Sequence, residues 1–217
     1  MNVLIYGAGV LGRQVYHLIN EIPEITTSGF VDDTKEIGTS IFSDLKVCEN
    51  RETLDNKLIE DFDFSNKYGL ILAIGPDNLE ARWKVFCWGL EKGFDFPNLI
   101  HPKASIDASA STGKGNIILA NATIDYEVSI GDANYLDIGC LISHNNKIGN
   151  NNFLTTGCAT AGNVKFGSHN FVGMHSTFTD FVEVGCENYF SAKNLVNRNV
   201  PDKRKILTFH DQKSFPI

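Results

Sequence analysis

An apolar side chain recurs at every sixth position between residues 106 and 196. Sixteen positions lie in this register, and all are Ile, Leu, Val or Phe except Thr112 and Thr160. A period of six is typical of a parallel β-helix, in which each hexapeptide supplies one short strand and one turn. A glycine also recurs every eighteen residues, so three hexapeptides are expected to complete one triangular coil. These glycines are Gly113, Gly131, Gly149, Gly167 and Gly185.

The fourth residue after each apolar position is mostly small or carries an amide, which suits an inward-pointing side chain at a tight corner. These residues are Ala110, Ala122, Val128, Asn134, Cys140, Asn146, Asn152, Cys158, Val164, Asn170 and Ser176. The alternative, a β-sandwich, needs strands of alternating polarity and turns of variable length. Sixteen uninterrupted hexapeptides do not fit that pattern. We therefore predict a parallel β-helix over residues 99–196, followed by a C-terminal tail over residues 197–217.

The first half of the chain follows an α/β pattern. Residues 3–6 predict a buried parallel strand, and Gly7, Gly9 and Gly12 follow before an apolar stripe of helical period. Such a turn lets backbone N–H groups at a helix N-terminus approach a phosphate, whose negative charge the helix dipole favours. A lone GxGxxG motif is weak evidence for any one ligand. The alternative, that these glycines only pack the strand against the helix, therefore stays open.

Two further strands end at residues suited to a binding site. Residues 29–31 run into Asp32 and Asp33, where a βαβ unit places a carboxylate that accepts hydrogen bonds from a ribose or a base. Residues 68–74 end at Gly75. We expect these residues to line a nucleotide pocket together with the glycine turn.

The helix after the third strand completes the predicted domain. Asp77 and Glu80 have the spacing of a capping box. The residues expected on its buried face are Leu79, Trp83, Phe86, Cys87 and Leu90. Residues 1–98 are thus predicted to form a Rossmann-like domain. Because so short a segment leaves no room for a hydride-transfer site, a nucleotide sugar is a better match than the dinucleotide of a dehydrogenase.

Composition narrows the classes of partner. The formal net charge is −7 and no Lys/Arg cluster occurs, which argues against nucleic-acid binding. No segment approaches the roughly 20 apolar residues of a membrane span, and no signal peptide is visible, so a cytoplasmic protein is expected. The five cysteines form no CxxC pair and are odd in number, which favours reduced thiols over disulfides. We predict no metal site.

One histidine of the repeat stands out. His144 lies two residues after the inward position of Ile142, on the outer side of its coil. The residues eighteen positions away are Tyr126 and Gly162, and the glycine is expected to leave space beside the imidazole for a substrate. Histidine is the side chain best suited to accept a proton near neutral pH.

The two halves together resemble the bacterial nucleotide-sugar acyltransferases of the NeuD/PglD type. The resemblance spans residues 1 to about 195 and rests on the glycine-rich half-domain, the hexapeptides, the Ser143-His144 pair and the segment 161–167. It implies a left-handed β-helix and homotrimers with active sites in the grooves between subunits. It also implies transfer of acetyl from acetyl-CoA to an amino or hydroxyl group of a nucleotide-linked sugar.

The resemblance also implies roles for individual residues. His144 matches the general base, with Asn145 beside it in the catalytic site. The positions that match the nucleotide-sugar pocket are Gly7, Gly9, Gly12, Asp32, Asp33 and Gly75. The positions that match backbone along the coenzyme groove are Gly162, Gly173 and Ala192.

Four features depart from the family pattern. Asn145 stands where members often carry an acidic residue, and Phe153 stands where some place a second histidine, for which His175 is a candidate replacement. The glycine-rich last coil is replaced by residues 191–194, and the usual closing segment by residues 199–202.

The resulting hypothesis is an acetyl-CoA-dependent N-acetyltransferase acting on a nucleotide-linked amino sugar in surface-polysaccharide biosynthesis. An O-acetyltransferase that uses the same base is one alternative. A non-catalytic trimer that binds a nucleotide sugar is another, motivated by Asn145 and Phe153. A dehydrogenase is the least favoured.

Overall fold

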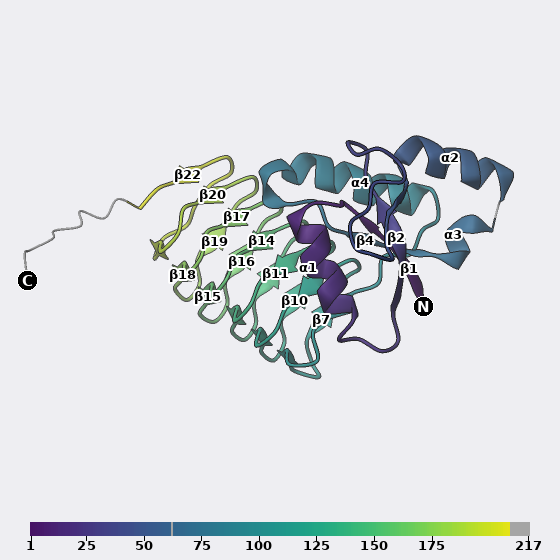
Figure 1. Ribbon diagram of the computed structural model, residues 1–217. Helices are drawn as coiled ribbons and strands as arrows, with labels where there is room; N and C mark the ends of the chain where they lie inside the picture. Colours follow the sequence, from purple (N-terminus) through teal and green to yellow (C-terminus); the bar gives the residue numbers. More distant parts are fainter. Residues whose placement is uncertain (62, 209–217) are drawn as a thin grey trace, which may run out of the picture.

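The computed structural model of the protein describes residues 1–61 and 63–208 (Figure 1). It contains an N-terminal α/β part and a long stack of triangular coils. The two parts lie next to each other. Within the described residues, no helix has the length and apolar character needed to cross a membrane. The nine C-terminal residues of the predicted tail lie outside the described part.

The α/β part is built on a parallel four-stranded sheet with the strand order β3-β2-β1-β4. Its strands are β1 (Asn2–Tyr6), β2 (Thr26–Val31), β3 (Val47–Glu49) and β4 (Gly69–Leu72). Its helices are α1 (Val10–Ile19), α2 (Arg51–Glu60), α3 (Phe64–Lys67), the 3-10 turn η1 (Pro76–Asn78) and α4 (Leu79–Glu91). The predicted order of strand, glycine turn and helix is observed at β1 and α1.

The start and the buried face of α4 differ from the prediction. The N-cap is Asn78, whose side chain accepts a hydrogen bond from the Ala81 N–H at 2.9 Å. Glu80 instead forms an ion pair with Lys84 one turn further on. The buried residues are Arg82, Val85, Phe86 and Gly89, whereas Cys87 and Leu90 are exposed. The face of α4 that packs on the coils includes Arg82. A prediction from apolar residues alone therefore assigned part of the buried face wrongly.

The coils form a parallel, left-handed β-helix with three flat faces. The first face contains β5 (Leu99–Ile100), β8 (Ile117–Ile118), β11 (Tyr135–Leu136), β14 (Phe153–Leu154), β17 (Phe171–Val172), β20 (Tyr189–Phe190) and β22 (Lys205–Ile206). The second contains β6 (Ser105–Ile106), β9 (Thr123–Ile124), β12 (Leu141–Ile142), β15 (Ala159–Thr160), β18 (Thr177–Phe178) and β21 (Leu195–Val196). The third contains β7 (Ser111–Thr112), β10 (Ser129–Ile130), β13 (Lys147–Ile148), β16 (Lys165–Phe166) and β19 (Glu183–Val184). Paired strands are eighteen residues apart, which confirms the predicted coil.

The interior of the coils combines apolar side chains with a row of amides. The predicted inward aliphatic and aromatic positions form one buried cluster that also contains Cys140 and Cys158. Asn134, Asn152 and Asn170 stack at the edge between the third and first faces and are 0 % exposed. Each donates through its side-chain amide to the asparagine one coil before it, at 2.9–3.1 Å. The stacked amides satisfy one another where a buried polar group would otherwise be costly.

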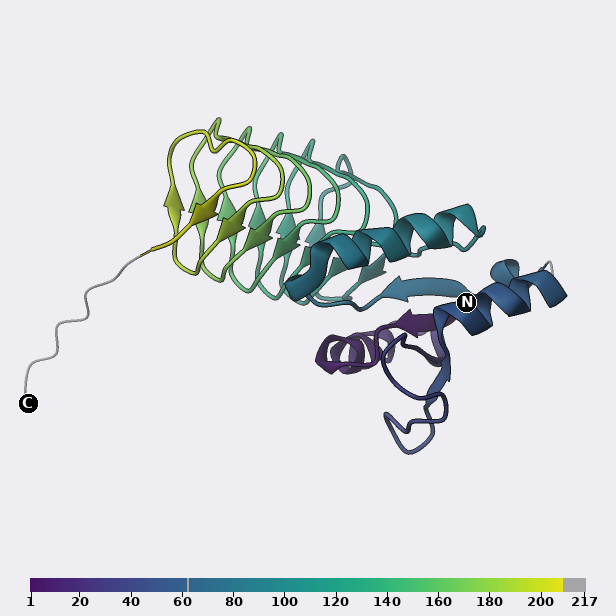
Figure 2. The same ribbon diagram turned by 90° about the horizontal axis from the view of Figure 1, so that it is seen from above.

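The α/β part packs on the first face of the β-helix. Figure 2 shows α4 lying along the coils, and apolar residues of α1 share a core cluster with Tyr135 and Phe153. The Arg82 guanidinium is fully buried at this junction and donates to the Ala133 carbonyl and to Asn151 Oδ1. Phe153 stacks on Tyr135 with ring centroids 4.2 Å apart, so it forms part of the junction.

Candidate functional site

A cavity of about 360 Å³ opens at the carboxyl ends of β1, β2 and β4. Ligands of open α/β sheets bind at this edge. Five of the six residues predicted to bind a nucleotide sugar line the cavity, namely Gly7, Gly9, Asp32, Asp33 and Gly75. Other lining residues include Tyr6, Thr34, Arg51 and Asn78, which the sequence did not single out.

The three glycines of the first turn serve different purposes. Gly7 has a φ of +114°, and a Cβ there would lie 2.5 Å from the Ala73 carbonyl oxygen. Gly12 is buried in α1, where a Cβ would lie 2.0 Å from the Gly7 carbonyl oxygen, and it is not among the cavity-lining residues. Gly9 caps α1 and has open space around it. Close packing therefore explains Gly7 and Gly12, and Gly9 leaves the helix N-terminus accessible.

Asp32 is buried and holds the loops around the cavity together. Its Oδ2 accepts from the Ala8 N–H at 2.8 Å, and its Oδ1 accepts from the Thr34 N–H at 2.9 Å, the Thr34 hydroxyl at 2.7 Å and the Lys35 N–H at 3.1 Å. Burial alone would raise the pKa of Asp32, but the hydrogen bonds from Thr34 and Ala8 outweigh it and hold that pKa below its ordinary value. Asp32 is thus an ionised structural anchor of the glycine turn.

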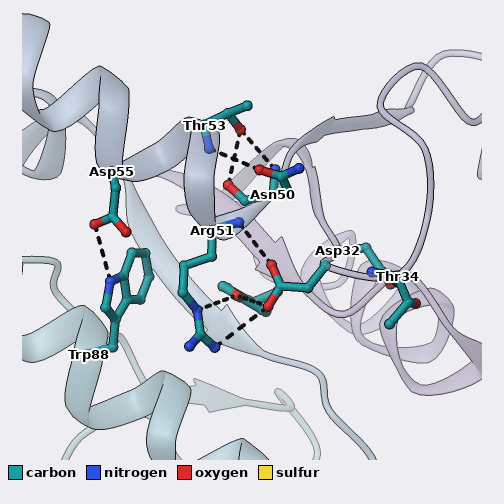
Figure 3. Close-up of polar contacts among 9 residues, drawn as sticks. Asp32, Thr34, Asn50, Arg51, Thr53, Asp55 and Trp88 are labelled. Atoms are coloured by element: carbon teal, nitrogen blue, oxygen red, sulfur yellow. Dashed lines mark hydrogen bonds and ion pairs between the residues drawn. The ribbon is translucent and has the colours of Figure 1, made fainter.

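Asp33 belongs to a second group of polar side chains at the same edge. The Tyr6 hydroxyl donates to Asp33 Oδ2 at 2.7 Å, and Arg51 lies against both, with Nε 3.2 Å from the Tyr6 hydroxyl and Nη2 3.6 Å from Asp33 Oδ2. Burial and the neighbouring Asp33 raise the pKa of Tyr6, so its hydroxyl stays a donor. The Arg51 side chain extends past Trp88, with its guanidinium carbon 5.6 Å from the ring centroid (Figure 3).

Arg51 is positioned by the start of α2. Asn50 and Thr53 form a capping box in which each side chain bonds the backbone N–H of the other (Figure 3). The Arg51 N–H also donates to Asp33 Oδ1 at 2.8 Å. No sequence pattern predicts this arrangement, because the start of α2 is brought to Asp33 by the pairing of β2 with β3.

His144 lies at the edge between the second and third faces, between Tyr126 on one neighbouring coil and Gly162 on the other. The Tyr126 and His144 rings are stacked, with centroids 5.3 Å apart and planes 9° from parallel. A Cβ on Gly162 would lie 2.4 Å from His144 Cε1. The sequence led us to expect open space for a substrate next to Gly162. In the structure the His144 imidazole itself occupies this space.

A hydrogen bond selects one tautomer of His144. Its Nδ1 lies 2.9 Å from Asn145 Oδ1. Because an amide oxygen only accepts, this contact is a hydrogen bond when Nδ1 carries the proton, and in the neutral imidazole the lone pair is then on Nε2. Among the described residues, no hydrogen bond to Nε2 is made, so in this tautomer Nε2 is an acceptor without a partner in the described part of the chain.

The residues predicted along the coenzyme groove lie at two edges. Gly162 is beside His144, and its N–H donates to Asp180 Oδ1 at 3.1 Å. Gly173 and Ala192 lie on consecutive coils at the edge between the first and second faces, where a Cβ on Gly173 would be 2.5 Å from the Ala192 nitrogen. His175 is at that same edge, over Gly157. The second face separates these residues from His144.

A single chain does not bring the two candidate sites together. Within the described part of the chain, the residues that line the cavity all belong to the α/β part, which packs on the first face. His144 occupies the edge of the triangular coil opposite that face. No residue of the His144 edge lines the cavity.

The sequence of residues 2–88 matches the family model of the PglD N-terminal domain. No protein with a curated description matches the chain. Among solved structures, PerB from Caulobacter crescentus in complex with CoA and GDP-perosamine is similar at a TM-score of 0.84 and 25% identity, over 96% of this chain and 94% of that one.

Two further structures share the fold. The acetyltransferase domain of PglB from Neisseria gonorrhoeae in complex with acetyl-CoA has a TM-score of 0.81 and 20% identity, over 95% of this chain and 96% of that one. WeeI from Acinetobacter baumannii has a TM-score of 0.51 and 16% identity, over 96% and 97%. The family model thus matches residues 2–88, and the chain as a whole resembles the sugar acetyltransferases of the NeuD/PglD type.

Proposed function

We propose that this protein transfers the acetyl group of acetyl-CoA to the amino group of a nucleotide-linked amino sugar. The observation that carries the proposal is His144, which is held as the Nδ1–H tautomer by Asn145 with its Nε2 free at an outer edge of the β-helix. The PglD-type N-terminal domain with its cavity supports a nucleotide sugar as the acceptor. PerB, which was crystallised with CoA and GDP-perosamine, supports both classes of substrate.

The proposed reaction needs one base and no covalent enzyme intermediate. The sugar amine attacks the thioester carbonyl, a C–N bond forms, and the C–S bond breaks to release the CoA thiolate. His144 Nε2 accepts the proton lost by the nitrogen and can return it to the thiolate. Holding both substrates in one groove supplies the gain from proximity.

The oxyanion of this reaction requires a hydrogen-bond donor. The Gly162 N–H, beside His144, donates to Asp180 in the structure. The Gly162 N–H can donate to the oxyanion only if the Asp180 side chain moves away from it. If Asp180 stays in place, another backbone N–H must donate to the oxyanion.

The cavity of the N-terminal domain is proposed to hold the nucleotide. Gly9 leaves the N-terminus of α1 open to a phosphate. Asp33 and Arg51 offer an acceptor and a cation to the base or ribose. In this division, residues 1–98 bind the nucleotide sugar and residues 99–196 carry the acyl-transfer chemistry.

We propose that the active enzyme is a homotrimer. In one chain His144 and the cavity lie on opposite sides, so a second copy must supply one of them for both substrates to meet. The second face between His144 and the Gly173 edge also exposes Leu141 and Leu195, at 51% and 68%. A groove between copies would join the His144 edge of one chain with the Gly173 and Ala192 edge of another.

The structure bears on the alternatives. Asn145, which motivated a non-catalytic protein, holds the His144 ring by a hydrogen bond. An O-acetyltransferase would use the same base. It differs from an N-acetyltransferase in the attacking atom, which is a hydroxyl oxygen of the sugar instead of an amine nitrogen. Because acetyl-CoA is a metabolite of the cell interior, the reaction is proposed to occur in the cytoplasm.

The proposed function is tested by thiol release from acetyl-CoA with a panel of UDP-, dTDP- and GDP-linked amino sugars and their hydroxyl counterparts. We expect release with one amino sugar nucleotide and loss of at least about 100-fold in kcat for His144→Ala, a typical contribution of general-base catalysis. His17→Ala is the matched control and should keep its activity, because His17 is exposed on α1 and does not line the cavity. Release only with hydroxyl sugars would identify an O-acetyltransferase, and no release with any sugar would refute acetyl transfer.

A further inference from the structure

The amide that holds His144 is itself bound by a carboxylate from the preceding coil. Asn145 Nδ2 donates to Glu127 Oε2 at 2.5 Å, and Asn145 Oδ1 lies 2.9 Å from His144 Nδ1. Glu127 and Asn145 are eighteen residues apart and occupy the same corner of adjacent coils. We propose that Glu127 is a positioning residue that supplies its negative charge to His144 through the Asn145 amide. This inference rests on the proposed function of His144 as a base.

The chemistry of the three groups fixes the direction of the relay. A carboxylate only accepts, so Asn145 must turn its NH₂ group toward Glu127 and its oxygen toward His144. The amide oxygen then accepts from Nδ1–H, which leaves the lone pair on Nε2. Without Glu127, the amide is free to flip and offer its NH₂ group to Nδ1, which would favour the other tautomer.

The carboxylate also stabilises charge that develops during proton transfer. When Nε2 accepts a proton, the imidazole becomes a cation, and hydrogen bonds joined in a chain polarise one another. An ionised end group makes such bonds stronger. The carboxylate one coil away thus supplies a negative charge that the neutral Asn145 amide lacks.

The backbone fixes both partners of the relay. Glu127 and Asn145 have left-handed φ values of 55° and 58°, which project their side chains outward from the same corner. The Glu127 N–H donates to Ser109 Oγ at 2.9 Å, and the Asn145 N–H donates to the Tyr126 carbonyl at 3.1 Å. The relay therefore follows from the eighteen-residue repeat.

Glu127→Gln removes the charge but keeps the shape of the side chain. We expect kcat to fall about tenfold with little change in KM for either substrate. A loss of this order is typical when a residue that orients a functional histidine is removed. Glu187→Gln is the matched control, because Glu187 is also exposed in a left-handed corner but lies at another edge. An unchanged kcat in Glu127→Gln would overturn the proposal.

A residue swap tests the relay more strictly. Asn145→Asp alone places two carboxylates in contact, and we expect it to be impaired. In the double variant Glu127→Gln with Asn145→Asp, the amide and the carboxylate exchange positions, so the carboxylate contacts the His144 ring and the amide donates to that carboxylate. This variant should recover kcat to within about threefold of the wild type. Failure of the double variant to exceed Asn145→Asp, with both folded by circular dichroism, would count against the relay.

A spectroscopic measurement separates this inference from the acetyltransferase activity. The ¹⁵N chemical shifts of His144, assigned with His144→Gln, report which ring nitrogen carries the proton. We expect the Nδ1–H tautomer in the wild type and in the double variant, and a mixed population in Glu127→Gln and Asn145→Ala. A wild type in the Nε2–H form would refute the relay even if thiol release is observed, and an Nδ1–H form without thiol release would leave the relay intact but refute the proposed function.

Discussion

Asp32 illustrates at the scale of one residue how a carboxylate that lines a cavity can also stabilise the fold. All its hydrogen bonds come from its own loop or from the glycine turn, through Ala8, Thr34 and Lys35. The sequence placed it directly after a strand, which the structure confirms. Its role as a partner for ribose stays a prediction. Asp32 is 8% exposed, whereas the Asp33 side chain is 40% exposed, so Asp33 is the more accessible acceptor.

The stability of the protein is predicted to depend on the ionisation of Asp32. Its folded pKa lies below the unfolded value of about 3.9, so the ionised form stabilises the fold at higher pH, and that contribution is lost as pH falls through the folded pKa. We expect Asp32→Asn to lower the free energy of unfolding at pH 7, with a difference from wild type that narrows toward pH 3. Urea unfolding at both pH values measures this.

Asp77→Asn is the control for that experiment, because Asp77 is exposed. It should change the free energy of unfolding little at either pH. A deficit of Asp32→Asn that stays the same at pH 7 and pH 3 would show that the charge of Asp32 does not stabilise the fold.

At the scale of elements, the β-helix is stabilised by repetition of the same contacts in every coil. The row of asparagines at one edge joins each coil to the next, and Asn152 takes part on both sides. It donates to Asn134 Oδ1 and the Gly167 carbonyl, and its oxygen accepts from the Asn170 N–H and side chain. The sequence predicted these inward corners but not their hydrogen bonds, because amide orientation depends on the neighbouring coils.

Asn152→Ala is predicted to be strongly destabilising. It deletes these side-chain bonds and leaves buried donors without partners, at about 1–3 kcal/mol for each group left unsatisfied. We expect a loss of about 3 kcal/mol or more in the free energy of unfolding, measured by urea titration. Asn56→Ala, on the exposed face of α2, is the control and should stay within about 0.5 kcal/mol of wild type. A loss of less than about 1 kcal/mol for Asn152→Ala would contradict the role of the row.

For the whole molecule, the main consequence of the fold is the separation of the two candidate sites. The α/β part covers the first face, whereas His144 stands at the opposite edge. A second copy is therefore needed if both are to act on one substrate. Exposed Leu141 and Leu195 on the second face are the apolar surface through which copies are proposed to meet.

Replacing both leucines should separate the proposed trimer. For Leu141→Glu with Leu195→Glu, light scattering is expected to fall from about three times the 24.0 kDa of one chain to that of one chain, with loss of thiol release. Ile59→Glu, on α2 and 82% exposed, is the matched control and should remain trimeric. A wild type that is monomeric and active would refute the intersubunit site.

The sequence by itself determined the β-helix, because each hexapeptide repeats the same local choice of inward apolar residue and corner residue. It also determined the strand, glycine turn and helix that open the chain, since these depend on neighbouring residues. Only the tertiary structure decided that Arg82 is buried, that Arg51 meets Asp33, and that Glu127 supports Asn145. These contacts join residues distant in sequence, and their geometry is set by how strands, helices and coils pack.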